Sequence, residues 1–210
     1  MRIAFLLFDG VTALDVIGPY EVLSRLPGIE SVFVAREPGA KSASGGLRLL
    51  ADQALSDVAY PEVVVIPGGS GVHALLNDEP VLSWLRTAHS RSRWTTSVCT
   101  GALLLGAAEI LRGLRATTHW RSLELLSSFG AEPVSERIVE SGKVITAAGV
   151  SAGIDFALLL ASRIRGDGMA KAIQLALEYD PRPPFDCGSP EKAGPELVEL
   201  VRQSTQRAES

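Results

Sequence analysis

The chain has 210 residues, of which 46% are hydrophobic and only 6% aromatic, so it is long enough to bury the core of one domain. Its formal net charge of -4, with no basic cluster, argues against nucleic acid as a partner, and no apolar run reaches the roughly 18 residues that span a membrane. Two distant cysteines, Cys99 and Cys187, and the lack of a signal-peptide pattern favour a reduced, cytoplasmic protein.

The first expected element is a central parallel strand, because Arg2 to Phe8 is a continuous apolar run. A helix is expected from Tyr20 to Leu26, with Pro19 in its first turn. Asp15 lies in the connection between the two, among apolar neighbours. This carboxylate either caps the helix, which is common for Asp, or has a chemical role.

A glycine-rich turn follows the next strongly β-prone segment. Before it come an expected strand at Ile29 to Arg36 and a small hairpin at Lys41 to Ala51. Val63 to Ile66 is a strand that runs directly into Pro67-Gly-Gly-Ser-Gly71, and such turns line the crevice of an open α/β sheet. Gly68 and Gly69 are therefore candidates for a cradle of backbone N–H groups that faces Cys99, with a plain tight turn as the alternative. The spacing of a phosphate-binding loop is missing.

The chemistry is expected at the next corner of the chain, after an amphipathic helix at Asp78 to Arg91. Trp94 to Val98 is a β-prone run and Gly101 to Ala108 suits a helix, so the chain must turn sharply at Cys99 and Thr100. A nucleophile on such an elbow is lifted out of the sheet, and the helix start lowers a thiol pKa and favours the thiolate. The alternative is a small buried hydrophobic residue.

The segment after the elbow helix carries a histidine. Arg115 to Trp120 is expected to return the chain to the sheet and to begin another helix, which ends at Phe129. His119 either orients the thiolate or is a structural hydrogen-bonding group. Val150 follows a hairpin-like pair at Ile138 to Ala147 and is a candidate wall of the substrate pocket.

The carboxyl-terminal part begins with a nearly all-apolar helix at Ile154 to Ile164, expected to be buried or packed against a second subunit. Its Asp155 is interpreted as a buried, satisfied structural carboxylate. The remaining expected elements are a helix at Asp167 to Leu177, an irregular loop at Tyr179 to Pro190 that holds a non-catalytic Cys187, and a fraying polar helix at Glu196 to Gln206. We therefore expect one domain over 1–190 and a helical tail over 191–210.

Several stretches together resemble the ThiJ/PfpI superfamily. They are the Asp15 connection, Pro67 to Gly71, Ser97-Val-Cys-Thr-Gly101, Ala116-Thr-Thr-His-Trp120 and Ala152-Gly-Ile-Asp-Phe156. Leu14 to Pro19 and the tail from Glu178 to Pro190 resemble the isonitrile (isocyanide) hydratase branch. The superfamily's proteases have histidine directly after the cysteine, whereas this chain has Thr100, and its deglycase-like members usually have glutamate where this chain has Asp15.

The resemblance implies a flavodoxin-like three-layer α/β sandwich with a mostly parallel sheet, and a homodimer. It also implies Cys99 as nucleophile, Asp15 as its acidic partner and Thr100 as a hydrogen-bonding neighbour. The implied reaction adds water to an isocyanide through a Cys99 thioimidate, with Asp15 as general acid and base and no metal or organic cofactor. Backbone N–H groups of Gly69 and Thr100 would stabilise developing negative charge.

Three other functions stay open at this point. A glyoxalase- or deglycase-type enzyme would use the same thiolate on 2-oxoaldehydes. A cysteine amidase or peptidase would need a base, for which His119 is the candidate. A ligand-sensing domain of an AraC-like regulator shares Ala116 to Trp120, but those regulators continue into a DNA-binding domain for which this chain leaves no room.

Overall fold

The structure is a computed structural model that describes residues 1–209, with side-chain surroundings described for residues 1–203. The described chain forms two compact units, Met1–Leu177 and Glu178–Ser210. The division that we expect after residue 190 falls inside the second of these. No helix in the described part of the chain is long and apolar enough to cross a membrane.

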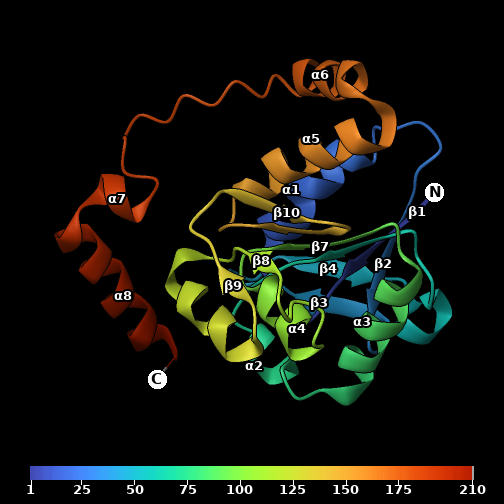
Figure 1. The fold of residues 1–210 in the computed structure, drawn as a ribbon, viewed down its shortest axis with the longest axis horizontal. Coiled ribbons are helices and arrows are strands. Elements are labelled where there is room, and N and C mark those ends of the chain that lie inside the picture. The colour runs from blue at the N-terminus through green and yellow to red at the C-terminus, as the bar shows by residue number, and fades with distance from the viewer. Residues whose placement is uncertain (210) are drawn as a thin grey trace. The chain divides into compact units, whose positions relative to one another are not determined.

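A seven-stranded sheet organises the first unit (Figure 1). Its strands, in spatial order, are β10 (Ile138–Ser141), β11 (Val144–Ala147), β7 (Trp94–Val98), β6 (Val63–Ile66), β1 (Arg2–Leu6), β2 (Glu30–Ala35) and β5 (Gln53–Ala54). Every pair is parallel except β10 with β11. The inner order β2-β1-β6-β7-β11 is that of a flavodoxin-like sheet, whose ligands bind where the strand order reverses, beside the carboxyl ends of β1 and β6. The expected fold class is confirmed.

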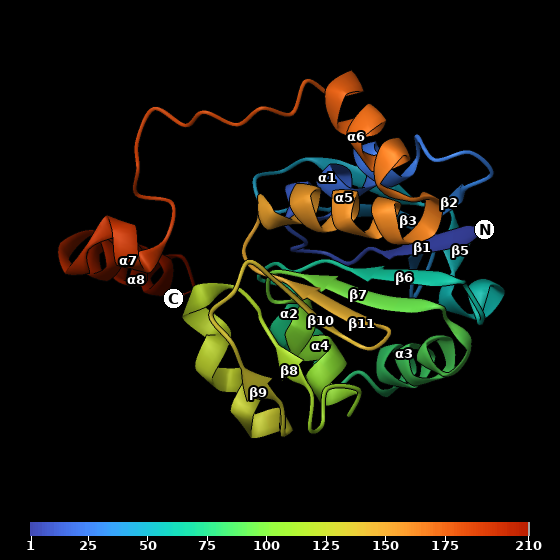
Figure 2. The ribbon, with the colours of Figure 1, turned by 45° about the horizontal axis from the view of Figure 1, so that its top comes forward.

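Helices cover both faces of this sheet (Figure 2). One face carries α1 (Ala13–Leu23), α5 (Ala152–Arg165) and α6 (Asp167–Ala176). The other carries α2 (Val72–Leu75), α3 (Glu79–Arg91) and α4 (Gly101–Ala107). Because both faces are covered, β6 is buried at every residue and its sequence is apolar without alternation.

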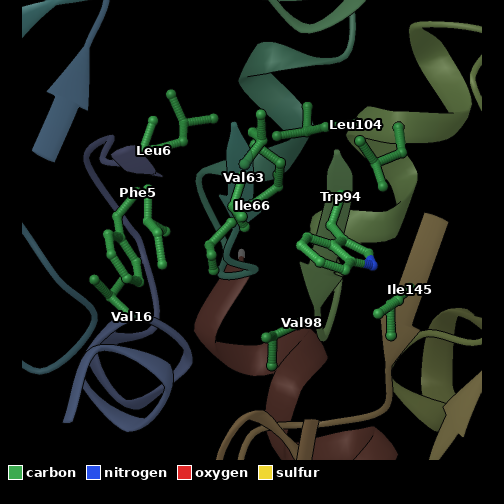
Figure 3. Packing of buried hydrophobic residues seen from close by; sticks show 14 of the residues in the cluster. Phe5, Leu6, Val16, Val63, Ile66, Trp94, Val98, Leu104 and Ile145 are labelled. Carbon is green, nitrogen blue, oxygen red and sulfur yellow. The ribbon is translucent and has the colours of Figure 1, made fainter. Parts of the chain in front are cut away.

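The core therefore lies on both sides of the sheet. Figure 3 shows Phe5 and Val16 packed on one side of the strands and Leu104 on the other. Phe5 also stacks on Phe33, with ring centroids 5.4 Å apart. These contacts explain why the interior strands of the sequence are almost continuously hydrophobic.

Helix α1 begins earlier than the sequence predicts, at Ala13, so Pro19 lies inside it instead of in its first turn. The helix packs closely on the start of α5. A Cβ at Gly18 would lie 3.1 Å from Ile154 Cγ1, and a Cβ at Gly153 would lie 3.2 Å from Pro19 Cδ. This approach brings the first turn of α1 and the segment before α5 to the same edge of the sheet.

The prediction that the chain returns to the main sheet after α4 is wrong. β8 (Arg115–Ala116) instead pairs with β9 (Glu132–Pro133) in a separate two-stranded sheet, because β11 already occupies the edge of β7. The segment from Trp120 to Phe129 is a 3₁₀-helix, η2. A second small sheet joins β3 (Gly39–Ser42) to β4 (Arg48–Ala51), as the predicted hairpin requires, and a short 3₁₀-helix, η1, spans Leu55–Val58.

The second unit contains two helices, α7 (Pro190–Ala193) and α8 (Pro195–Glu209). The residues between α6 and α7 form no regular element, as the prolines predict, and Cys187 in that segment is exposed.

Candidate active site

The segments that follow three strands meet at the carboxyl edge of the sheet, and hydrogen bonds join them. Asp15 follows β1, Gly68 follows β6 and Cys99 follows β7. The Gly68 N–H donates to Asp15 Oδ2 at 2.9 Å, and the Gly68 carbonyl accepts from the Thr12 N–H at 2.9 Å. Residues far apart in the sequence therefore form one site, at the place where a flavodoxin-like sheet binds its ligands.

Cys99 sits on the predicted elbow. Its φ of 56° is left-handed, which is uncommon and strained for a residue with a side chain. The main chain holds it there: its N–H donates to the carbonyls of Ala147 (3.0 Å) and Ala148 (3.1 Å). Its carbonyl accepts from the Thr118 hydroxyl at 2.6 Å. Thr118 is a site residue that our sequence analysis missed, although it lies in the Ala116 to Trp120 motif.

Glycines let the turn after β6 pack closely against this elbow. A Cβ at Gly68 would lie 2.5 Å from the Thr100 nitrogen and 2.9 Å from Cys99 Cβ. A Cβ at Gly101 would lie 2.2 Å from the carbonyl oxygen of Ile66. No side chain fits at either position without displacing backbone, so both glycines are required by the packing of the site.

Asp15 is fully buried and is not a helix cap. Thr12 occupies the N-cap position of α1, and Asp15 lies within the first turn. Within the described residues its Oδ1 has no hydrogen-bond partner, whereas its Oδ2 accepts the Gly68 N–H. Burial raises the pKa of Asp15 to about 7, against the opposing effects of the Gly68 N–H and the Cys99 side chain.

Burial also raises the pKa of the Cys99 thiol, to about 12, and the charge of Asp15 adds to the increase. Hydrogen bonds from Thr100 and from the backbone N–H of Val150 oppose it. The predicted depression of this pKa by the helix start is therefore wrong, because desolvation outweighs the hydrogen bonds that favour the thiolate. The two groups titrate as a coupled pair that resists losing both protons.

The proposed N–H cradle at Gly68 and Gly69 is already occupied. Gly68 donates to Asp15, and the Gly69 N–H donates to the Thr100 hydroxyl at 2.9 Å. These groups hold the acid and the threonine in place, so they are not an open anion site. The groups that stabilise negative charge on the sulfur belong to Thr100 and Val150.

His119 borders the site as a neutral ring. Burial lowers its pKa to about 4, with a smaller effect from the charge of Arg121. Its Nδ1 accepts the Arg121 N–H at 3.3 Å, which leaves the proton on Nε2. A Cβ at Gly149 would lie 2.4 Å from His119 Cδ2, so the ring packs on the segment that leads to Val150. Among the described residues, no hydrogen bond joins this ring to Cys99, so the geometry gives no support to a Cys-His pair.

Comparisons with known proteins agree with this architecture. A family model described as the DJ-1/PfpI family matches residues 1–163. The chain is 44% identical to an isonitrile hydratase of Pseudomonas putida over 97% of this chain and 89% of that protein. The crystal structure of a ThiJ/PfpI family protein from Pseudomonas syringae superposes with a TM-score of 0.93 and 35% identity, covering 99% of this chain and 88% of that one. A glutathione-independent glyoxalase of Caenorhabditis elegans is 26% identical over 73% of this chain and 82% of that protein.

Proposed function

Because the chain belongs to the DJ-1/PfpI family, we propose that it is an isonitrile hydratase, which converts an isocyanide and water to an N-substituted formamide. The observation that carries the proposal is the likeness to the Pseudomonas putida isonitrile hydratase across nearly the whole of both chains. The buried pair of Cys99 and Asp15 supplies a nucleophile and a proton carrier at one point, which is what this reaction needs.

In the first step the Asp15 carboxylate takes the proton of the Cys99 thiol as the sulfur attacks the terminal carbon of the isocyanide. The carbon–sulfur bond forms from the sulfur electron pair, and Asp15 then delivers the same proton to that carbon. The product is a thioimidate, R–N=CH–S–Cys99, and Asp15 is again ionised. The raised pKa of Asp15, about 7, suits it to accept and return one proton near neutrality.

In the second step Asp15 takes a proton from water as the water oxygen attacks the thioimidate carbon, and the nitrogen gains that proton. The tetrahedral species R–NH–CH(OH)–S–Cys99 then collapses. Its carbon–sulfur bond breaks, the hydroxyl proton passes to the departing sulfur through Asp15, and the formamide R–NH–CHO leaves. The N–H groups of Thr100 and Val150 stabilise the sulfur whenever it carries negative charge. The scheme uses only this chain's own residues.

A substrate panel on the purified protein tests the proposal. An alkyl or aryl isocyanide, methylglyoxal and a chromogenic amide are supplied separately, and products are identified by mass spectrometry. We expect the formamide from the isocyanide, with one oxygen from solvent when the reaction runs in H₂¹⁸O. Conversion of methylglyoxal to lactate without isocyanide turnover would replace this proposal with a glyoxalase function. The similarity to the Caenorhabditis elegans glyoxalase is the reason for including methylglyoxal in the panel.

A further inference from the structure

Arg137, in the loop before β10, contacts the segment after β11 and the first turn of α5 in three ways. Its carbonyl accepts from the Ala148 N–H at 2.9 Å. Its Nε donates to Asp155 Oδ2 in the first turn of α5, and its Nη2 lies 3.3 Å from the Ser151 hydroxyl. One residue therefore brackets the segment 148–155 at both ends.

That segment forms one wall of the reactive centre. Cys99 donates its N–H to the carbonyls of Ala147 and Ala148, and the Val150 N–H acts on the Cys99 sulfur. Within the segment, the N–H groups of Ala152, Gly153 and Ile154 donate to the carbonyls of Gly149, Val150 and Ser151, and Ser151 adds no side-chain cap hydrogen bond. The contacts of Arg137 tie this turn, and with it the Val150 N–H, to the loop before β10.

We propose that Arg137 and Asp155 form a positioning pair, which holds the backbone N–H of Val150 against the Cys99 sulfur while negative charge develops there. The inference rests on the proposed function and adds two residues to it that act through Val150. The Arg137 side chain is 51% exposed and that of Asp155 29%, so the ion pair contributes little to the free energy of folding by itself. Its effect is on geometry.

The structure contains a matched control. A second ion pair, Arg163 with Glu140, also joins α5 to β10, with nitrogen–oxygen distances of 2.9 and 3.2 Å. Arg163 lies in the last turn of α5, away from the turn that follows Val150. Breaking this pair removes an anchor of α5 on the same hairpin without touching the segment beside Cys99.

The experiment measures the rate of Cys99 alkylation by iodoacetamide against pH, in a Cys187→Ala background so that one thiol is followed. Asp15, the titratable group that interacts with Cys99, is unchanged in every variant. Arg137→Gln and Asp155→Asn should each slow alkylation below its pH midpoint by about 3- to 10-fold, the equivalent of one ordinary net hydrogen bond. Arg163→Gln should leave the profile unchanged, and Arg137→Lys should recover part of the loss.

The two substitutions separate positioning from a simple charge effect. Removing the Arg137 cation by itself disfavours a thiolate, whereas removing the Asp155 anion by itself favours it. If the pair acts by positioning, Arg137→Gln and Asp155→Asn both lower the rate of Cys99 alkylation. The double variant is then alkylated no more slowly than the slower of the two single variants. Opposite directions, or an equal effect of Arg163→Gln, would overturn the proposal. If Arg137→Gln does not fold, Asp155→Asn by itself distinguishes positioning from a charge effect, because positioning slows alkylation and loss of the anion would speed it.

Alkylation needs no isocyanide, so the result is independent of the substrate panel. If the wild-type protein does not hydrate isocyanides and both variants still slow alkylation, the proposed function fails and the positioning pair remains. If the wild type is a hydratase, kcat should fall in both variants more than KM rises, because the lost interaction is made with the charged sulfur.

Discussion

At the residue scale, the proposed chemistry depends on two buried acids that share protons. Asp15 and Cys99 each have a raised pKa because burial disfavours their charged forms, and ionised Asp15 further disfavours a thiolate. In the proposed mechanism the sulfur therefore becomes nucleophilic as its proton moves to Asp15, which makes the acid part of the activation step.

Replacing each cysteine separately tests the nucleophile. Cys99→Ala should remove isocyanide turnover and leave the circular dichroism spectrum unchanged, since alanine fills most of the same space. Cys187→Ala is the control and should keep full activity, because that residue is exposed in an irregular segment. Comparable turnover in the wild type and Cys99→Ala would exclude Cys99 as the nucleophile.

Asp15→Asn separates proton transfer from thiol reactivity. The amide keeps the size of the side chain and can still accept the Gly68 N–H, but it carries no transferable proton, so turnover should fall by roughly 10²- to 10⁴-fold. Alkylation of Cys99 at alkaline pH should be as fast or faster, because loss of the neighbouring negative charge lowers the thiol pKa. Undiminished turnover would remove Asp15 from the mechanism.

The pH dependence of kcat/KM follows from the Asp15 pKa. The carboxylate must be ionised to accept the thiol proton, so protonation below about pH 7 removes the active form. We expect kcat/KM to fall tenfold per pH unit on the acid side of that value and to level off above it, since the thiol keeps its proton well beyond neutrality. Stopped-flow rates between pH 5 and 9 measure this, and a profile that is flat down to pH 5 would contradict it.

At the scale of elements, the site depends on how closely the turn after β6 approaches the elbow and α4. Gly101→Ala places a methyl group within 2.2 Å of the Ile66 carbonyl oxygen and should lower the free energy of unfolding by about 1–3 kcal/mol or more. Gly168→Ala in α6 is the matched control, because its Cβ meets no atom within 4 Å. Alanine there should stabilise the helix by up to about 1 kcal/mol. Urea unfolding of both variants gives the comparison, and equal stability would refute it.

The α1 and α5 helices illustrate a second element-scale effect. Gly18 and Gly153 let them approach closely, so the acid on α1 and the Val150 segment before α5 reach the same sulfur. The positioning pair proposed for Arg137 and Asp155 acts on the same segment from the β10 side. The reactive centre is thus held between two helices and a hairpin.

At the scale of the whole molecule, we propose a homodimer. The family resemblance and the largely apolar helix α5 motivate it. Sedimentation equilibrium at micromolar concentration should give twice the 22.3 kDa of one chain. A purely monomeric species at that concentration would be the contrary result.

The sequence by itself determined the elements whose residue patterns are local. The β-branched run from Val63 to Ile66, the change from strand to helix residues at Cys99, and the glycine-rich turn after β6 each follow from composition over a few residues, and the structure confirms them. The fold class follows as well, since buried parallel strands must be apolar on both faces. Pro19 misled the assignment of α1, because a proline is expected in the first turn of a helix and here it lies inside one.

Only the tertiary structure decided what the site residues do. Whether Asp15 caps a helix or lies buried beside a thiol depends on Gly68, 53 residues away in the sequence. The raised pKa values of Asp15 and Cys99 come from desolvation, which no single segment encodes. The same holds for the Thr118 hydroxyl on the Cys99 carbonyl and for Arg137 beside Asp155. Such interactions form between chain segments that only the folded sheet brings together, so their energies cannot be read from sequence spacing.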